Sequence, residues 1–146
     1  MRLLTFSLLL LASTGFAAEK KVKLKDLPPA VRKTVDELGK TATLVGFAKE
    51  VEDGKTLYEA ETKVNGKTRD VTIDAEGKIV TTEEEVAIDT IPAAARAAIE
   101  KAAAGGKITL VEKVTSGSAV KYEAAITPKS GKKKEVSFNA EGAPVK

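Results

Sequence analysis

Apolar and polar residues alternate along several stretches of the chain, and this period of two is typical of half-buried β-strands. It predicts strands at about residues 43–51, 56–64 and 68–73, and a further strand near 78–86. Within the second stretch, Tyr58 and Ala60 would lie on one face of a sheet, and Glu59 and Glu61 on the other. The pattern therefore predicts a sheet with one apolar face and one polar face.

Two dipeptides, Asp53-Gly54 and Asn65-Gly66, separate the first three of these stretches. Asp, Asn and Gly all tolerate positive φ, which the two central residues of a tight hairpin turn require. The three stretches should therefore pair in order as antiparallel hairpins.

Helical spacing precedes these strands. Val31 and Val35 lie four residues apart, between Asp26 as the expected N-cap and Gly39 as the expected end of a helix. Before this helix, the apolar residues at 22 and 24 alternate with lysines, and this alternation predicts a short first strand.

The same order of elements is predicted twice, because residues 22–80 and 86–145 read as two copies of one unit. At an offset of 64 residues, Leu27-Pro28 matches Ile91-Pro92, and Tyr58 matches Tyr122. In the second copy Thr90 would be the N-cap.

Each copy would have the order β-α-β-β-β, which predicts an α+β fold: tandem repeats that form an antiparallel sheet, with one helix packed per repeat. The expected repeats are residues 18–85 and 86–146. Alternation assigns both tyrosines to the face that the helices cover.

The first 17 residues have the pattern of a secretory signal peptide. Arg2 precedes a mostly apolar run from Leu3 to Leu11, and Gly15 and Ala17 are the small residues of a cleavage site. The alternative, a membrane anchor, needs a longer apolar run than this one to cross about 30 Å of hydrocarbon. The expected location is periplasmic or secreted, without stable membrane insertion after cleavage.

Composition limits the chemistry that the chain can carry out. It has no His and no Cys, which excludes His-based triads, thiol catalysis and ordinary zinc sites. The net charge is only +3, without the concentrated basic face of a nucleic-acid-binding protein. Ser130 and Lys133 form an S-x-x-K motif, but the Gly- and Lys-rich sequence around them favours a solvated hairpin turn. We therefore expect no enzyme activity and no cofactor.

Three short motifs resemble ligand-binding loops. Gly54-Lys55-Thr56 and Gly66-Lys67-Thr68 lack the earlier glycine of a phosphate-binding loop. The segment Asp74–Gly77 has too few oxygen ligands for calcium, and its counterpart begins with Asn139. All three are predicted to be turns, and no metal is expected. The acidic run 83–85 and the basic run 132–134 are predicted to be solvated and to discourage aggregation at strand edges.

The polar face of the sheet is the candidate binding surface. Its residues are Glu59, Glu61, Lys63, Asp70, Thr72, Lys121 and Glu123, with Thr127 beside them. The alternative is an ordinary wetted face, since antiparallel sheets commonly expose one side to water.

The Leu-Pro and Ile-Pro helix starts, the Tyr58-Glu59 and Tyr122-Glu123 strands and the Asp74–Lys78 turn resemble those of the PepSY-like domain family. This family includes a group described as β-lactamase-inhibitor-like. The resemblance implies an exported, non-enzymatic module that binds and restrains a peptidase or another envelope enzyme. The expected partner is a protein or peptide of the cell envelope. The alternative is a structural or sensory envelope module with no defined pocket for a partner.

Overall fold

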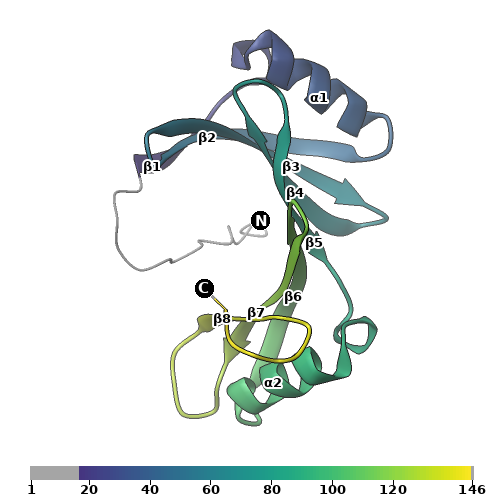
Figure 1. Cartoon of the computed structure of the whole chain (residues 1–146), viewed down its shortest axis with the longest axis vertical. Helices are drawn as coiled ribbons and strands as arrows, with labels where there is room; N and C mark the ends of the chain where they lie inside the picture. Colours follow the sequence, from purple (N-terminus) through teal and green to yellow (C-terminus); the bar gives the residue numbers. More distant parts are fainter. Residues whose placement is uncertain (1–16, 146) are drawn as a thin grey trace, which may run out of the picture.

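The computed structural model describes residues 17–145, which form one antiparallel sheet of eight strands with two helices (Figure 1). The α+β prediction is confirmed at this level. The strands are β1 (Ala17–Lys21), β2 (Thr43–Glu52), β3 (Lys55–Val64), β4 (Lys67–Asp74), β5 (Ile79–Glu85), β6 (Lys107–Ser116), β7 (Ala119–Thr127) and β8 (Lys134–Phe138). The helices are α1 (Pro29–Gly39) and α2 (Ala93–Ala103).

Each strand pairs with the next one in the sequence, so the sheet is a simple meander. Asp53, Gly54, Asn65 and Gly66 all have positive φ, as expected for tight hairpin turns between β2, β3 and β4. The sheet curves strongly, and both helices lie on its outer, convex side (Figure 1). Its other side is concave and carries no helix from residues 17–145. Neither α1 nor α2 is long and apolar enough to cross a membrane, nor is any other helix within residues 17–145.

The core lies between each helix and the convex face of the sheet. Under α1, Val31 and Val35 are buried against a cluster that includes Tyr58, Ala60 and Val71. This arrangement confirms the predicted alternation, because Tyr58, Ala60 and Val71 face the helix while Glu59 and Glu61 face the other side.

A second cluster lies under α2. Ala95 and Ile99 are buried with Ala124 and Ile126, and Tyr122 is partly buried against them. Both tyrosines therefore belong to the core, as predicted.

The predicted N-caps are wrong. Asp26 and Thr90 end short 3₁₀ turns, and the residues that cap the two helices are Pro28 and Pro92, without a side-chain cap. The hydroxyl of Thr90 instead donates to the carbonyl oxygen of Ala87 at 2.6 Å. A residue that precedes proline is disfavoured in the helical conformation, so Leu27 and Ile91 cannot be the first helical residues that caps at Asp26 and Thr90 would require.

The predicted first strand is displaced. The structure has β1 at Ala17–Lys21, whereas Leu24 begins a 3₁₀ turn and is 37% exposed. Only the Val22 N–H continues the pairing, donating to the carbonyl oxygen of Phe47 at 3.0 Å. Two apolar residues are too few to distinguish the end of a strand from the turn that follows it.

The segment Asp74–Lys78 is a turn, as predicted. One carboxylate oxygen of Asp74 accepts the backbone N–H groups of Glu76 and Lys78 at 3.1 and 2.8 Å. Asn139 accepts from Ala143 N–H in the same way, at 2.9 Å. These side chains therefore shape the backbone of the turn.

Candidate binding face

The concave face of the sheet gathers the acidic side chains of distant strands. Residues directly opposite each other in antiparallel strands project from the same face. Glu61 lies opposite Asp70, and Asp70 lies opposite Glu83. Further along the sheet, Glu112 lies opposite Glu123.

Every strand of the sheet contributes at least one carboxylate to this face. We use the name carboxylate row for nine of them. In strand order they are Glu19, Glu50, Glu59, Glu61, Asp70, Glu83, Glu112, Glu123 and Glu135. Glu85 also faces this side but accepts hydrogen bonds from the backbone N–H and the hydroxyl of Thr68 at 3.1 and 3.3 Å, and is not counted in the row.

Glu112 is the most deeply placed member of the row. It is 6% exposed, and its carboxylate has no hydrogen bond or ion pair within residues 17–145. Burial, followed by the negative charge of Glu83, raises the pKa of Glu112 to about 8. Desolvation disfavours a charged carboxyl group, and a like charge nearby adds to this effect.

Three other members have strongly raised values. Burial raises the pKa of Glu59 to about 8 and that of Glu83 to about 7, with nearby carboxylates adding to both shifts. Burial and the charge of Glu61 raise the pKa of Asp70 to about 6. The row therefore titrates as a coupled set, and part of it stays protonated near neutral pH.

Small or apolar residues alternate with the carboxylates and explain their desolvation. Ala48 lies opposite Glu59, and Val114 lies opposite Glu83. Two further pairs follow the same rule, namely Glu50 with Leu57 and Ala125 with Glu135. These four apolar residues are all buried on the face that carries no helix.

Glu123 is a member of the row with two side-chain partners. Its Oε1 atom accepts from the Lys121 ammonium at 2.8 Å and from the Ser137 hydroxyl at 3.0 Å. The charge of Lys121 also opposes the rise in the pKa of Glu83. The charge of Lys21 likewise opposes the rise in the pKa of Glu19.

All seven residues of the predicted polar face lie on the concave side. Glu61 and Asp70 are brought together, as are Lys121 and Glu123, while Thr72 lies opposite Glu59. The seventh, Lys63, is exposed near the end of β3.

Sequence reasoning missed five members of the row: Glu19, Glu50, Glu83, Glu112 and Glu135. It placed Glu83 on a solvated edge. The structure corrects this, because β5 pairs with β4 and β6 and lies inside the sheet. The basic run 132–134 is exposed as predicted. The alternation signal at Glu83 was present in the sequence, but strand order was needed to interpret it.

The described residues include no group of three or more acidic, His or Cys side chains arranged to hold a metal ion. The carboxylates are spread along the sheet and do not converge on one point. Ser130 and Lys133 lie exposed in the loop between β7 and β8.

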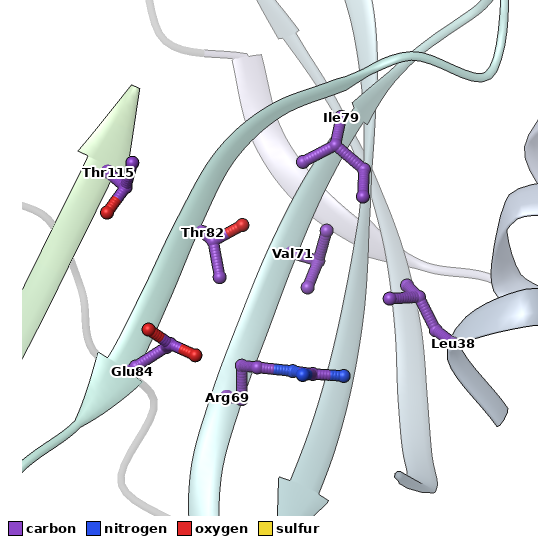
Figure 2. Close-up of a pocket in the computed structure, with 7 residues that line it drawn as sticks. All are labelled: Leu38, Arg69, Val71, Ile79, Thr82, Glu84 and Thr115. Carbon is purple, nitrogen blue, oxygen red and sulfur yellow. The ribbon is translucent and has the colours of Figure 1, made fainter. Parts of the chain in front are cut away.

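A shallow groove of about 330 Å³ lies on the opposite, convex face (Figure 2). The Arg69 guanidinium extends toward Leu38 there, and its Nε and Nη2 atoms are buried without a partner. Glu84 lies directly opposite Arg69 in the sheet and also lines the groove. Glu84 is therefore the nearest candidate acceptor for the Arg69 guanidinium, and the groove is not treated as a binding site.

No protein-family model and no curated protein sequence matches the chain. Several solved structures match it in fold. One is a protein from Bacteroides eggerthii for which a periplasmic location is inferred. It is 20% identical to this chain, the match covers 82% of this chain and 86% of that one, and the TM-score is 0.66.

Two further matches have similar values. A DUF2874 family protein from Bacteroides ovatus has 22% identity, coverage of 83% and 86%, and a TM-score of 0.62. A BLIP-like protein from Bacteroides fragilis has 21% identity, coverage of 82% and 84%, and a TM-score of 0.59. At these identities the likeness establishes the fold: a helix-backed, curved antiparallel sheet shared with DUF2874 and BLIP-like proteins.

Proposed function

We propose that this protein is an exported, non-enzymatic module that binds a protein or peptide of the cell envelope on the concave face of its sheet. The buried carboxylate of Glu112, which has no partner within residues 17–145, carries the proposal. An unpaired, desolvated acidic group lowers the stability of the fold. Natural proteins commonly keep such groups where function requires them.

The tandem-repeat interpretation is part of this proposal. Helix α1 is followed by the four strands β2–β5, and α2 by the three strands β6–β8. The Asp74 and Asn139 turns share their hydrogen bonds at an offset of 65 residues. Two repeats joined through β5 and β6 would make one continuous concave face, wide enough for an extended segment of a partner.

Different observations support the proposed export, the binding role and the absence of catalysis. Export is supported by the predicted signal peptide and by the periplasmic location inferred for the Bacteroides eggerthii protein of similar fold. A binding role, with restraint of an envelope enzyme as one form of it, is supported by the BLIP-like description of the Bacteroides fragilis protein. The composition, with neither His nor Cys, supports a role without catalysis.

We expect the protein recovered from an exported fraction to begin at Ala18, because Gly15 and Ala17 form the best cleavage site. Mass spectrometry of the intact protein would measure this directly. Recovery of the full-length chain from the cytoplasm alone would contradict export.

Changing Glu59 and Glu61 to Gln is expected to reduce capture of the partner from an envelope fraction by about tenfold, because charge on an interface sets both specificity and association rate. Quantitative mass spectrometry of the captured proteins would measure the change. The matched control changes Lys33 and Lys101, on the exposed sides of the helices, to Gln. Equal capture by wild type and the Glu variant, with loss in the Lys variant, would move the site to the convex side.

A further inference from the structure

We infer that the occupant of the concave face is a cationic segment of polypeptide, whose Lys and Arg side chains pair with the carboxylate row. This inference rests on the proposed function and names the chemistry of its partner. It draws on charge, on a mostly buried carboxyl group without a partner within residues 17–145 and on the spread of the carboxylates over the sheet.

The charge of the concave face is opposite to that of the whole chain. The chain carries a net charge of +3, yet every strand contributes a carboxylate to this face. Lys121 forms an ion pair with Glu123, and Lys21 lies on the same face near Glu19. The carboxylates of this face outnumber these cations, so a cationic segment would be attracted to it. The charge pattern therefore selects both the partner and the side on which it docks.

The carboxyl group of Glu112 is a second observation that favours a cationic partner. Its side chain is more than nine-tenths buried, projects from the concave face beside Glu123, and has no partner within residues 17–145. A buried carboxylate is stabilised most by a cation that also donates hydrogen bonds, as the ammonium of Lys and the guanidinium of Arg both do. A neutral donor would form hydrogen bonds with Glu112 without balancing its charge, and an anionic partner would add a further like charge.

The placement of the carboxylates favours a segment of chain over a small inorganic cation. Ala48, Leu57, Val114 and Ala125 separate members of the row and are themselves buried, so they keep the carboxylates apart. The spread of the carboxylates over eight strands also matches a segment with several cationic side chains better than one ion.

Binding should be coupled to proton release, because a bound cation favours the ionised form of a carboxyl group. The charged groups that share the concave face around Glu112 are Asp70 on β4, Glu83 and Glu85 on β5, Lys121 and Glu123 on β7, and Glu135 on β8. All except Lys121 are acidic. Burial and these negative charges together favour the protonated form of Glu112 until a cation binds.

The test uses the purified protein and a synthetic ten-residue peptide of alternating Lys and Ala, with a Glu and Ala peptide of equal length as the anionic control. Isothermal titration at low salt and about pH 7, in two buffers of different ionisation enthalpy, measures Kd and proton release together. We expect the Lys peptide to bind with release of protons, binding to weaken as salt is added, and the Glu peptide not to bind.

Two double variants with the same number of Glu to Gln changes locate the site. Glu83→Gln with Glu112→Gln should weaken binding of the Lys peptide by about tenfold or more and remove the proton release. Glu76→Gln with Glu100→Gln, at exposed positions away from the row, should change Kd by less than about twofold. Thermal melting verifies the fold, and the first variant should be at least as stable as wild type because it removes desolvated charges.

Failure to bind the Lys peptide, or equal weakening by both double variants, would overturn the inference. A dimer in light scattering that dissociates in the Glu83, Glu112 variant would also overturn it, because the occupant would then be a second copy of the chain. If the Lys peptide fails to bind while the Glu59, Glu61 variant still loses the envelope partner, the proposed function stands and only the cationic chemistry falls. If neither the peptide nor the partner depends on the concave face, both proposals fall.

Discussion

The protein is expected to lose stability as the pH rises from about 5 to about 8, by on the order of 2–4 kcal/mol. In the unfolded chain the row carboxyls would ionise near 4.5 for Glu and 3.8 for Asp, whereas folding raises the pKa of Glu59 and Glu112 to about 8 and that of Glu83 to about 7. Between these values the folded state binds more protons than the unfolded state. Stability is therefore complete below the unfolded pKa and is lost as the pH rises toward the folded values.

The expected loss of stability is smaller than the sum of the individual pKa shifts would give, because the row titrates as a coupled set and some of its members remain partly solvated. A loss of this size corresponds to a fall in Tm on the order of 10 °C for a chain of this length. Differential scanning calorimetry at the two pH values would measure it.

The control is the double change of Glu59 and Glu112 to Gln. It should raise Tm at about pH 8 and flatten the dependence on pH, since the amides cannot ionise and keep a similar shape. A wild-type Tm that is equal or higher at the upper pH would show that the carboxyls are better solvated or better paired than the structure indicates.

This dependence on pH also bears on how the concave face could work. The same desolvation that destabilises the ionised row strengthens its interaction with a cation that replaces the missing water. A partner that neutralises the row should therefore stabilise the protein most at the higher pH, where more of the row is charged. Binding and folding stability are linked through one set of protons.

The sequence predicted the two faces of the sheet well where a strand is apolar on one side only. In β3 and β4, Tyr58, Ala60 and Val71 face the helix as the period of two requires. The helix starts were misplaced because the sequence near Asp26 offers a good capping residue, but the prolines that follow restrict the backbone more strongly than a cap favours it.

The carboxylate row was only partly predictable, because β6 does not show a clean alternation. A bulge between Ile108 and Leu110 changes which face the later residues occupy, and apolar Val111 and Val114 then lie on opposite faces around Glu112. No local pattern shows that Glu112 and Glu83 share one face with Glu59. That relation comes from the register and curvature of the whole sheet, which bring together residues far apart in sequence.

The turns that follow β4 and β8 lead to the second large effect. Gly77→Ala is expected to destabilise the protein by about 2–4 kcal/mol, because two costs add. Gly77 has a φ of +85°, which is unfavourable for any residue with a Cβ, and a Cβ there would lie 2.6 Å from the carbonyl oxygen of Ala30 in α1. Gly142 repeats this geometry, with a φ of +78° and a distance of 2.7 Å to the carbonyl oxygen of Ala94 in α2. Urea unfolding followed by circular dichroism would measure the change.

Gly66→Ala is the matched control, since its φ of +82° is almost the same but a Cβ there would meet no atom within 4 Å. It should cost only about 1 kcal/mol, the backbone part of the effect. The difference between the Gly77 and Gly66 variants therefore measures how tightly the turn is packed on the first turn of α1. Because Gly77 and Gly142 contact different helices, their costs should add in the double variant. Equal losses for Gly77→Ala and Gly66→Ala would show that the turn can move away from α1 without cost, and the helices would then be held to the sheet by their buried apolar faces alone.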